Sequence, residues 1–495
     1  MSRKLPIFYS ALLLTAVNLL LRFVGTSFQV YLSGRIGAAG IGLLQLVMSV
    51  GGLSMVAGMA GIRTATMYLA AEELGHGQPN NTRWVLSGCF LYSILCSGGI
   101  AVILYSFAPK IAVHWIGDPQ TVASLRLYAA ILPVFCLCGV MTGYFTAANR
   151  IGTLAVIEVL EQLFAMIITM LTLTHWAGTD SGRACQCIIL GNGIGACFTL
   201  LCLVFLRLRE PVYTGPPVTV GSRLMQAAAP LALGDVLKSG INTTENLMVP
   251  KRLKLNKAVT NPLGAFGTIS GMVFPILMFP ACILYALAEL LIPELARCNA
   301  AGHTCRISYL VRRGLKVAML YGLCFGGLMF LLSESLCLTF YSSSEAARHL
   351  RLYALLIPML YCDAITDAMT KGLGQQQACV RYNIISSVLD VIFLFFFLPG
   401  YGMTGYFASF LITHLLNFIL SLQRLLKISR EHIPFHIPVL SAAAAVAAVW
   451  GAAQIHGEIG QCIAYIALLG SLLILFRIIG HEDIQWIRGL LKTRK

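Results

Sequence analysis

Residues 7–32 read IFYSALLLTAVNLLLRFVGTSFQVYL, and residues 41–70 read IGLLQLVMSVGGLSMVAGMAGIRTATMYLA. Each stretch is long enough to cross a membrane as a helix, because about 20 mostly apolar residues span the hydrocarbon layer. Each also holds one arginine, Arg22 in the first and Arg63 in the second. An arginine near the centre of a membrane helix costs about 2.5–3.5 kcal/mol on insertion scales, so its side chain faces water, a partner or a ligand rather than lipid.

The rest of the chain has the same apolar character. Of its 495 residues, 58% are hydrophobic and 11% are charged, and the mean hydropathy of +0.80 lies outside the range of soluble domains. We therefore predict an all-α polytopic membrane protein with about fourteen transmembrane helices. The predicted spans are 7–32, 41–70, 84–108, 122–147, 152–175, 185–206, 224–248, 263–292, 314–333, 348–370, 379–398, 402–423, 437–455 and 460–479.

The distribution of lysine and arginine predicts the orientation of these spans. With the N-terminus inside, 22 of the 35 basic residues fall on cytoplasmic segments and ten on outer segments, and Arg22, Arg63 and Lys238 fall within spans. Cytoplasmic loops of membrane proteins carry the excess of basic residues, so we expect both termini in the cytoplasm. The basic residues of these loops account for the net charge of +15, so no nucleic-acid partner is expected.

Cysteine usage gives no sign of a metal or cofactor. The sixteen cysteines are scattered through apolar runs, with no C-x-x-C pair and no histidine at ligand spacing. They are interpreted as small buried hydrophobic residues. No catalytic triad, phosphate-binding loop or large outer loop with catalytic residues is present either, so an enzyme is not expected.

An internal duplication predicts the domain organisation. LRLYA at 125–129, with Pro133, recurs at 350–354, with Pro358, an offset of 225 residues that places six spans in each half. Two six-helix repeats around a central cavity are a recurrent transporter plan. We expect an N-lobe over 1–209, a proline-containing linker over 210–221, a C-lobe over 222–430, two added spans within 431–480 and a basic cytoplasmic tail over 481–495.

Six short stretches also resemble a known family. They are GAAGIGL at 37–43, GYF at 143–145, LEQ at 160–162, VPKRL at 249–253, GM at 271–272 followed by Pro275, Phe279 and Pro280, and IPE at 292–294. In this order and spacing the chain resembles the polysaccharide flippases of the multidrug/oligosaccharidyl-lipid/polysaccharide exporter superfamily, and most closely the stage V sporulation protein B group. The likeness covers nearly the whole chain.

The resemblance implies a function as well as a fold similar to that of the multidrug extruders and lipid II flippases. Two lobes would alternate between inward-open and outward-open states and move a lipid-linked saccharide across the bacterial cytoplasmic membrane. The partners implied are this saccharide and membrane lipids, with the protein acting as a monomer. The precursor would belong to the cell wall, the spore cortex or a capsule.

In the related lipid II flippases, cationic residues in the cavity hold the pyrophosphate of the substrate. By position in this sequence, the residues that match this cationic pattern are Arg22, Arg63, Lys251 and Arg252. The alternative for Arg22 and Arg63 is structural pairing with an acid or with backbone carbonyls. The alternative for the basic cluster at 251–257 is a solvated loop or contact with lipid headgroups. Relatives tend to carry basic residues where Gln29 and Ala165 stand, which implies a less basic cavity here.

Intramembrane acids form a second group of candidate residues. Glu158 and Glu161 lie three apart and share a helical face, where they would either neutralise arginine or couple transport to a proton or cation. In span 224–248, Asp235, Lys238 and Glu245 form a polar stripe expected to line the cavity, with an Asp235–Lys238 salt bridge as the alternative.

The acidic residues in the second half of the chain are also compatible with a different transport mechanism. Asp363 and Asp367 lie four apart, with Asp390 in the next span, and could form a cation site or meet Lys371 and Arg381. A cation site would favour the runner-up function, a multidrug extruder that moves organic cations against sodium or protons. The first hypothesis remains a flippase for an anionic polyprenyl-(pyro)phosphate-linked saccharide.

Overall fold

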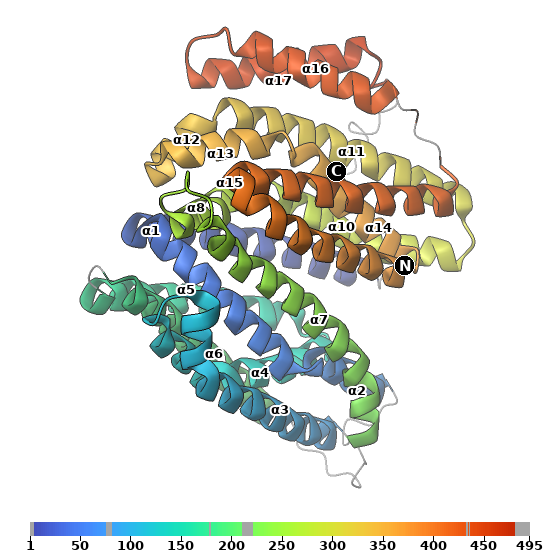
Figure 1. Cartoon of the computed structure of the whole chain (residues 1–495). Helices are drawn as coiled ribbons and strands as arrows, with labels where there is room; N and C mark the ends of the chain where they lie inside the picture. The colour runs from blue at the N-terminus through green and yellow to red at the C-terminus, as the bar shows by residue number, and fades with distance from the viewer. Residues whose placement is uncertain are drawn as a thin grey trace. The chain divides into compact units, whose positions relative to one another are not determined.

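A computed structural model describes residues 4–75, 82–177, 180–209, 221–431, 434 and 436–480 (Figure 1). Every regular element in these ranges is a helix, as the composition predicts. The elements are α1 (Lys4–Met59), α2 (Ile62–Gly75), α3 (Thr82–Lys110), η2 (Ile111–Ile116), α4 (Thr121–Ala147), α5 (Ile151–Thr172), η3 (Leu173–Ala177), α6 (Ser181–Leu208), α7 (Gly221–Leu253), α8 (Pro262–Thr268), η4 (Ile269–Val273), α9 (Phe274–Met278), α10 (Ala281–Ala300), α11 (Thr304–Leu331), α12 (Ser333–Tyr341), α13 (Ser344–Ala354), α14 (Ile357–Gly372), α15 (Gln376–Ser429), α16 (His436–Ala452) and α17 (Glu458–Leu475).

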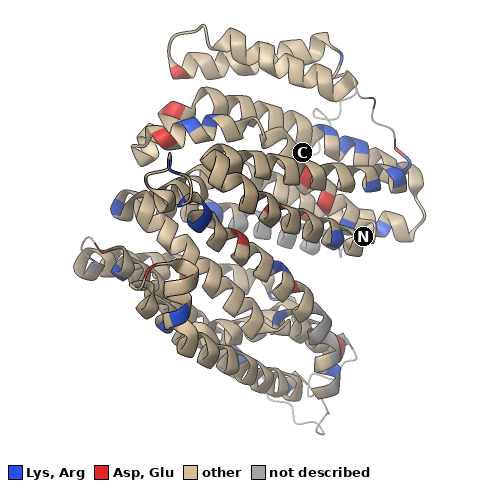
Figure 2. Ribbon diagram, in the orientation of Figure 1, with Lys and Arg blue, Asp and Glu red and all other residues tan. Residues whose placement is uncertain are grey.

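The helices are long and apolar enough for a polytopic membrane protein. Eight of those described could cross a membrane by length and composition, and ten could if each of two bent helix pairs forms one span. Figure 2 shows long stretches of helix without any charged residue. The all-α membrane fold is confirmed, whereas the count of fourteen spans is not. Non-helical backbone at Gly37 in α1 marks the break between the predicted spans 7–32 and 41–70, and Gly402 in α15 marks the break between 379–398 and 402–423.

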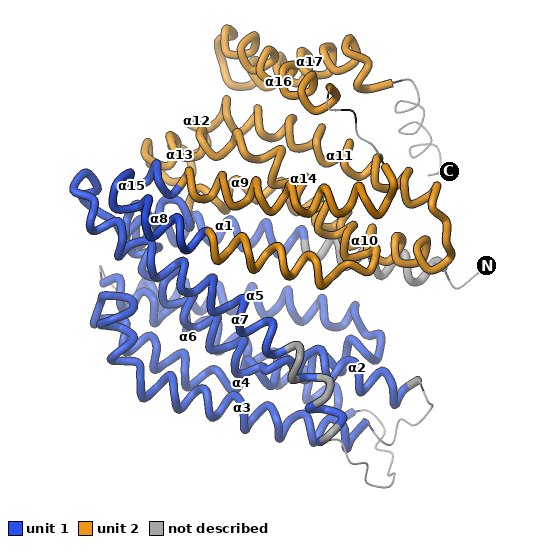
Figure 3. Tube along the Cα trace, turned by 45° about the vertical axis from the view of Figure 1, so that its right-hand side comes forward, with its two compact units in different colours: residues 1–271, 390–406 blue, residues 272–389, 407–495 orange. Residues whose placement is uncertain are grey.

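The chain divides into two compact units (Figure 3). The first comprises residues 1–271 and 390–406. Within it α4 packs against α2, α3 and α6, α5 packs against α6, and α1 packs against α7 and α8. Buried side chains from α2 to α7, such as Leu69, Phe145 and Leu203, form its core. The predicted lobe boundaries stay a prediction, and most of the predicted linker and all of the basic tail lie outside the described residues.

The second unit comprises residues 272–389 and 407–495. Its α14 packs against α10 and α11, and α16 and α17 pack against each other and against α11. The Tyr465 hydroxyl on α17 donates a hydrogen bond of 2.7 Å to the Leu323 carbonyl of α11, which fixes this helical pair on the unit. The pair corresponds to the two added spans predicted at the end of the chain.

The duplicated LRLYA motif occupies a comparable helix in each unit. In the first copy Leu125 and Tyr128 are buried on α4, and in the second Leu350 and Tyr353 are buried on α13. The first copy belongs to one continuous helix, whereas α13 and α14 are bent by 57° just before Pro358. The repeated apolar face therefore serves the same packing role in each half, since both copies bury the same leucine and tyrosine.

Gly37 separates the first two predicted spans. Its φ of 68° and ψ of 177° are the only non-helical values within α1. This region of backbone conformation is essentially restricted to glycine, because any larger residue strains the backbone by about 1–3 kcal/mol. The first glycine of the GAAGIGL stretch is thus needed for the turn in direction between residues 36 and 38.

Gly37→Ala should lower the stability of the folded protein by about 1–3 kcal/mol. No atom lies within 4 Å of a Cβ built at Gly37 or at Gly34, so the two sites differ in backbone conformation and not in space. Gly34→Ala is the matched control and should be neutral or slightly stabilising, because Gly34 is helical. Thermal unfolding of both variants in detergent checks this, and equal melting temperatures would contradict it.

Candidate functional site

Arg63 lies on the first turn of α2, directly after a break in the helix. The break is formed by Ala60 and Gly61, whose φ angles are 43° and 72°. On the opposite side, a Cβ at Gly143 of α4 would lie 2.5 Å from the Arg63 carbonyl oxygen, so α4 packs closely on the α2 backbone at this point. The Arg63 side chain is exposed, because this packing occupies only its backbone.

Arg22 lies on α1 and its side chain is also exposed. One turn further along α1, a Cβ at Gly25 would lie 3.8 Å from the Gln162 amide nitrogen of α5. The segment of α1 that carries Arg22 is therefore a neighbour of the α5 segment that carries Glu158 and Glu161. The structure brings together three of the helices on which the sequence predicted charged candidates.

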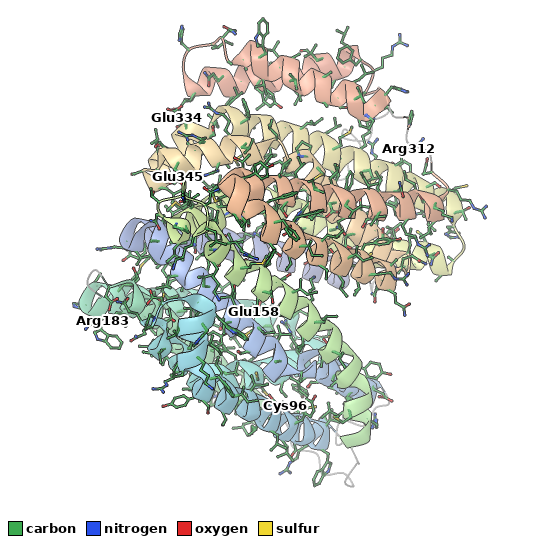
Figure 4. All side chains as sticks on the ribbon, viewed as in Figure 1. Cys96, Glu158, Arg183, Arg312, Glu334 and Glu345 are labelled. Carbon is green, nitrogen blue, oxygen red and sulfur yellow. The ribbon has the colours of Figure 1, made fainter. Side chains whose placement is uncertain are left out.

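The two carboxylates of α5 have different surroundings. Glu161 accepts a hydrogen bond of 2.7 Å from the hydroxyl of Thr199, a buried residue of α6. Glu158, labelled in Figure 4, attracts Arg63 electrostatically. The first unit thus contains a mixed cluster of arginines and carboxylates, in which Glu158 has an arginine nearby and Glu161 has a hydroxyl donor.

Gln29 and Ala165, where the resemblance implied basic residues in relatives, both contribute to packing in this chain. Gln29 donates a hydrogen bond of 3.3 Å to the Gly271 carbonyl. Ala165 is buried where α5 meets α6, and a Cβ at Gly191 would lie 2.8 Å from the Ala165 carbonyl oxygen. An arginine side chain at position 165 has no room in this arrangement.

Lys251 and Arg252 lie at the far end of α7, away from Arg63. The Lys251 ammonium donates to the His114 carbonyl of η2, and the Arg252 guanidinium lies 3.2 Å from the centroid of the Phe395 ring. Both side chains are thus engaged in contacts within the first unit. The four cationic residues predicted as one set are therefore not gathered in one place.

The separation follows from how α7 runs along α1 and α2. Arg223 at its start pairs with Glu72 and Glu73, and Asn246 donates a 3.0 Å hydrogen bond to the Ser49 hydroxyl, so the helices are antiparallel. Counting residues from these two contacts, Arg63 lies level with residue 233 of α7. Each residue of a helix advances about 1.5 Å along its axis. Arg252 is therefore about 29 Å from that level along the helix axis.

The polar stripe of α7 is only partly a surface feature. Asp235 and Lys238 are exposed. Glu245, about two to three turns further along, is hydrogen-bonded to the side chain of Asp390 on α15, and the buried Tyr406 interacts with both acids. Two carboxyl groups form a hydrogen bond only when one of them carries a proton. The two acids are therefore a candidate proton-binding pair.

Sequence reasoning missed this pair, because Asp390 was grouped with the acids of the preceding span. Glu245 and Asp390 are 145 positions apart and share no local spacing. The signal available was that each is an acid in an apolar span, a position where acids usually need a specific partner. The identity of that partner required the tertiary structure.

Asp363 and Asp367 of α14 lie in the second unit. The Asn417 amide donates to both carboxylate oxygens of Asp363, at 3.3 and 3.2 Å. Asp367 forms an ion pair of 2.5 Å with Lys371, one of the two partners that the sequence suggested. Among the described residues, no three His, Cys, Asp or Glu side chains are grouped as metal ligands.

Comparisons with known proteins identify one matching family model and two similar proteins of Bacillus subtilis. The family model described as MatE matches residues 15–173. The chain is 21% identical to Stage V sporulation protein B of Bacillus subtilis (strain 168), with 96% of each chain covered, and 21% identical to Sporulation protein YkvU of the same organism over 45% of this chain and 52% of that protein.

Two solved structures share the fold. The inward closed conformation of the lipid II flippase MurJ matches with a TM-score of 0.73 at 14% identity, covering 94% of this chain and 99% of that one. An inward-facing multidrug resistance MATE family transporter matches with a TM-score of 0.69 at 11% identity, covering 86% and 100%. The expected likeness to both kinds of transporter is confirmed.

Glu245→Gln should retain the hydrogen bond to Asp390, because the amide replaces the protonated carboxyl as donor. Glu245→Ala removes one partner of a buried hydrogen bond and should lower the free energy of unfolding by about 1–3 kcal/mol more than the amide does. Thermal unfolding measures the difference. In infrared spectra, the band of a protonated carboxyl group should disappear in Asp390→Asn, and an unchanged band would contradict a shared proton.

Proposed function

We propose that this chain belongs to the multidrug/oligosaccharidyl-lipid/polysaccharide exporter superfamily and that it is a flippase for an anionic polyprenyl-(pyro)phosphate-linked saccharide. It would carry this lipid across the bacterial cytoplasmic membrane by alternating access, with both termini in the cytoplasm. The members to which it is similar are transporters and not enzymes. The proposal adds the substrate class and the residues that contact it.

One observation carries the proposal: the exposed side chains of Arg22 and Arg63 lie within the predicted membrane spans. Facing lipid, the two arginines together would cost about 5–7 kcal/mol on insertion scales, which is comparable to the whole stability of many domains. Facing a water-filled cavity, they avoid this cost and remain charged. A guanidinium also donates two parallel hydrogen bonds to phosphate oxygens, which suits a compact anionic headgroup.

The neighbouring carboxylates suggest how the headgroup would be released again. Glu158 attracts Arg63 in the absence of substrate, so a bound phosphate has to compete with an internal anion. Such competition limits affinity, and a transporter needs a site that binds its substrate without retaining it. Arg63 also lies on the first turn of α2, where the helix dipole adds a partial positive charge.

Specific observations also favour the acids as coupling groups. Glu245 and Asp390 share a proton-dependent hydrogen bond, and Asp363 is held by a neutral amide rather than by a cation. In the flippase these acids would bind a coupling proton or cation. In the alternative function, an extruder of the multidrug type, the same acids would bind an organic cation directly.

Arg22→Ala and Arg63→Ala should each weaken binding of a polyprenyl diphosphate lipid by about tenfold to a hundredfold. This range corresponds to about 1.5–3 kcal/mol for a hydrogen bond to a charged group. Native mass spectrometry of the purified protein would count co-purified polyprenyl phosphate species in each variant. Arg126→Ala is the matched control, because the Arg126 guanidinium lies over the Tyr105 ring at 5.0 Å and should not contact the headgroup.

Lipid retention combined with an assay of sodium-dependent dye efflux distinguishes the flippase from the multidrug extruder. Retention of the lipid in both arginine variants, combined with sodium-dependent dye efflux that is lost in Asp363→Ala, would favour the extruder. Loss of the lipid in Arg22→Ala and Arg63→Ala but not in Arg126→Ala supports the flippase. The comparison separates the functions because one requires a cationic site and the other an anionic site.

A further inference from the structure

The end of α2 and the start of α7 are joined by a compact ion cluster in the first unit. One terminal nitrogen of the Arg223 guanidinium lies 2.9 Å from Glu73 Oε1, and the other lies 2.9 Å from Glu72 Oε2. The Glu73 side chain is only 6% exposed, whereas those of Arg223 and Glu72 are 33% and 35% exposed. One arginine therefore holds two carboxylates, one of them buried.

This cluster lies outside the membrane-spanning part of both helices. Glu72 and Glu73 follow the predicted span 41–70, and Arg223 precedes the predicted span 224–248. In the predicted topology both helix ends are cytoplasmic. The Arg223 guanidinium donates hydrogen bonds to the Glu73 and Glu72 carboxylates, and these bonds raise the pKa of the Arg223 side chain further above its usual range, so Arg223 stays charged at any physiological pH.

Further along, α7 is held to the first unit by other polar contacts. The Thr243 hydroxyl donates a 3.1 Å hydrogen bond to the Ser49 carbonyl, and Lys251 at the opposite end donates to the His114 carbonyl. Thr243 is buried within the predicted span 224–248, whereas the Lys251 contact and the Arg223 cluster lie at the ends of α7, where water can replace them. These end contacts differ in this respect from apolar core contacts such as those of Leu69 and Phe145 in the same unit.

Alternating access requires some helices to change neighbours, and an ion cluster at a water-accessible helix end suits that requirement. Separation of the two helix ends would hydrate Arg223 and Glu72 at little cost, while the buried Glu73 would lose its ion pair with Arg223. The cluster thus favours the joined arrangement without making it permanent. We propose that Arg223, Glu72 and Glu73 form a conformational latch that joins the start of α7 to the end of α2 in one transport state and opens in the other.

The latch rests on alternating access and is independent of which substrate is carried. Spin labels on a genetically encoded keto amino acid at Tyr68 and Met225, both exposed, would report the separation of the two helix ends by double electron–electron resonance without removing native cysteines. The measurement uses the full chain in lipid nanodiscs with no substrate added. The unsubstituted latch should give mainly one short-distance population.

Arg223→Gln should raise the ratio of long to short distances by about tenfold, which corresponds to about 1.4 kcal/mol. Arg223→Lys should give a smaller increase, because lysine keeps the charge but cannot donate to both carboxylates with a planar fork. Arg83→Gln is the matched control, since Arg83 is an exposed arginine at the start of α3 on the same predicted side. It should leave the distances unchanged.

Unchanged distances in Arg223→Gln would overturn the latch. If that variant does not fold, Glu72→Gln replaces it, because this change removes only the more exposed carboxylate and leaves Glu73 paired. It should still raise the long-distance population, and no rise would equally overturn the proposal. Arg22→Ala should not alter these distances, so a failure of the proposed headgroup site would be recognised separately from a failure of the latch.

Discussion

A charge inside an apolar layer must have a partner or face water, and this constraint explains how several acidic residues of the protein are paired. Asp367 is paired with Lys371, and Glu161 accepts from Thr199. Glu245 shares a hydrogen bond with Asp390. Each solution removes the cost of an isolated buried charge, which would otherwise exceed the stabilisation available from packing of the surrounding side chains.

Arg22 and Arg63 have exposed side chains, and Glu158 attracts Arg63 electrostatically. Their helices are held in position by backbone contacts that do not involve the guanidinium groups. Gly143 permits α4 to approach the backbone of α2 at Arg63, and Gly25 lies beside α5. The packing of small residues thus helps to fix where the two arginines are placed on their helices.

Helix α7 differs from its neighbours because its polar residues lie along its whole length. Arg223 pairs with two carboxylates, Thr243 and Asn246 bind Ser49, and Glu245 binds Asp390. Polar contacts of this kind are specific in geometry but weaken when water can replace them. A helix fixed in this way can be held firmly in one state and still be released, which suits a transporter better than a purely apolar interface would.

Composition and hydropathy alone determined that this is an all-helical membrane protein, because apolar stretches near 20 residues have few other stable conformations in lipid. The sequence also identified the repeated LRLYA motif and most of the charged candidates, since a repeated motif and intramembrane charges can be recognised locally. It did not determine which charges meet. The Glu245–Asp390 pair joins residues 145 positions apart, the Arg223 cluster joins residues 150 positions apart, and Lys251 lies far from Arg63. Such pairings depend on which helices pack together and in which direction they run, and only the tertiary structure decided that.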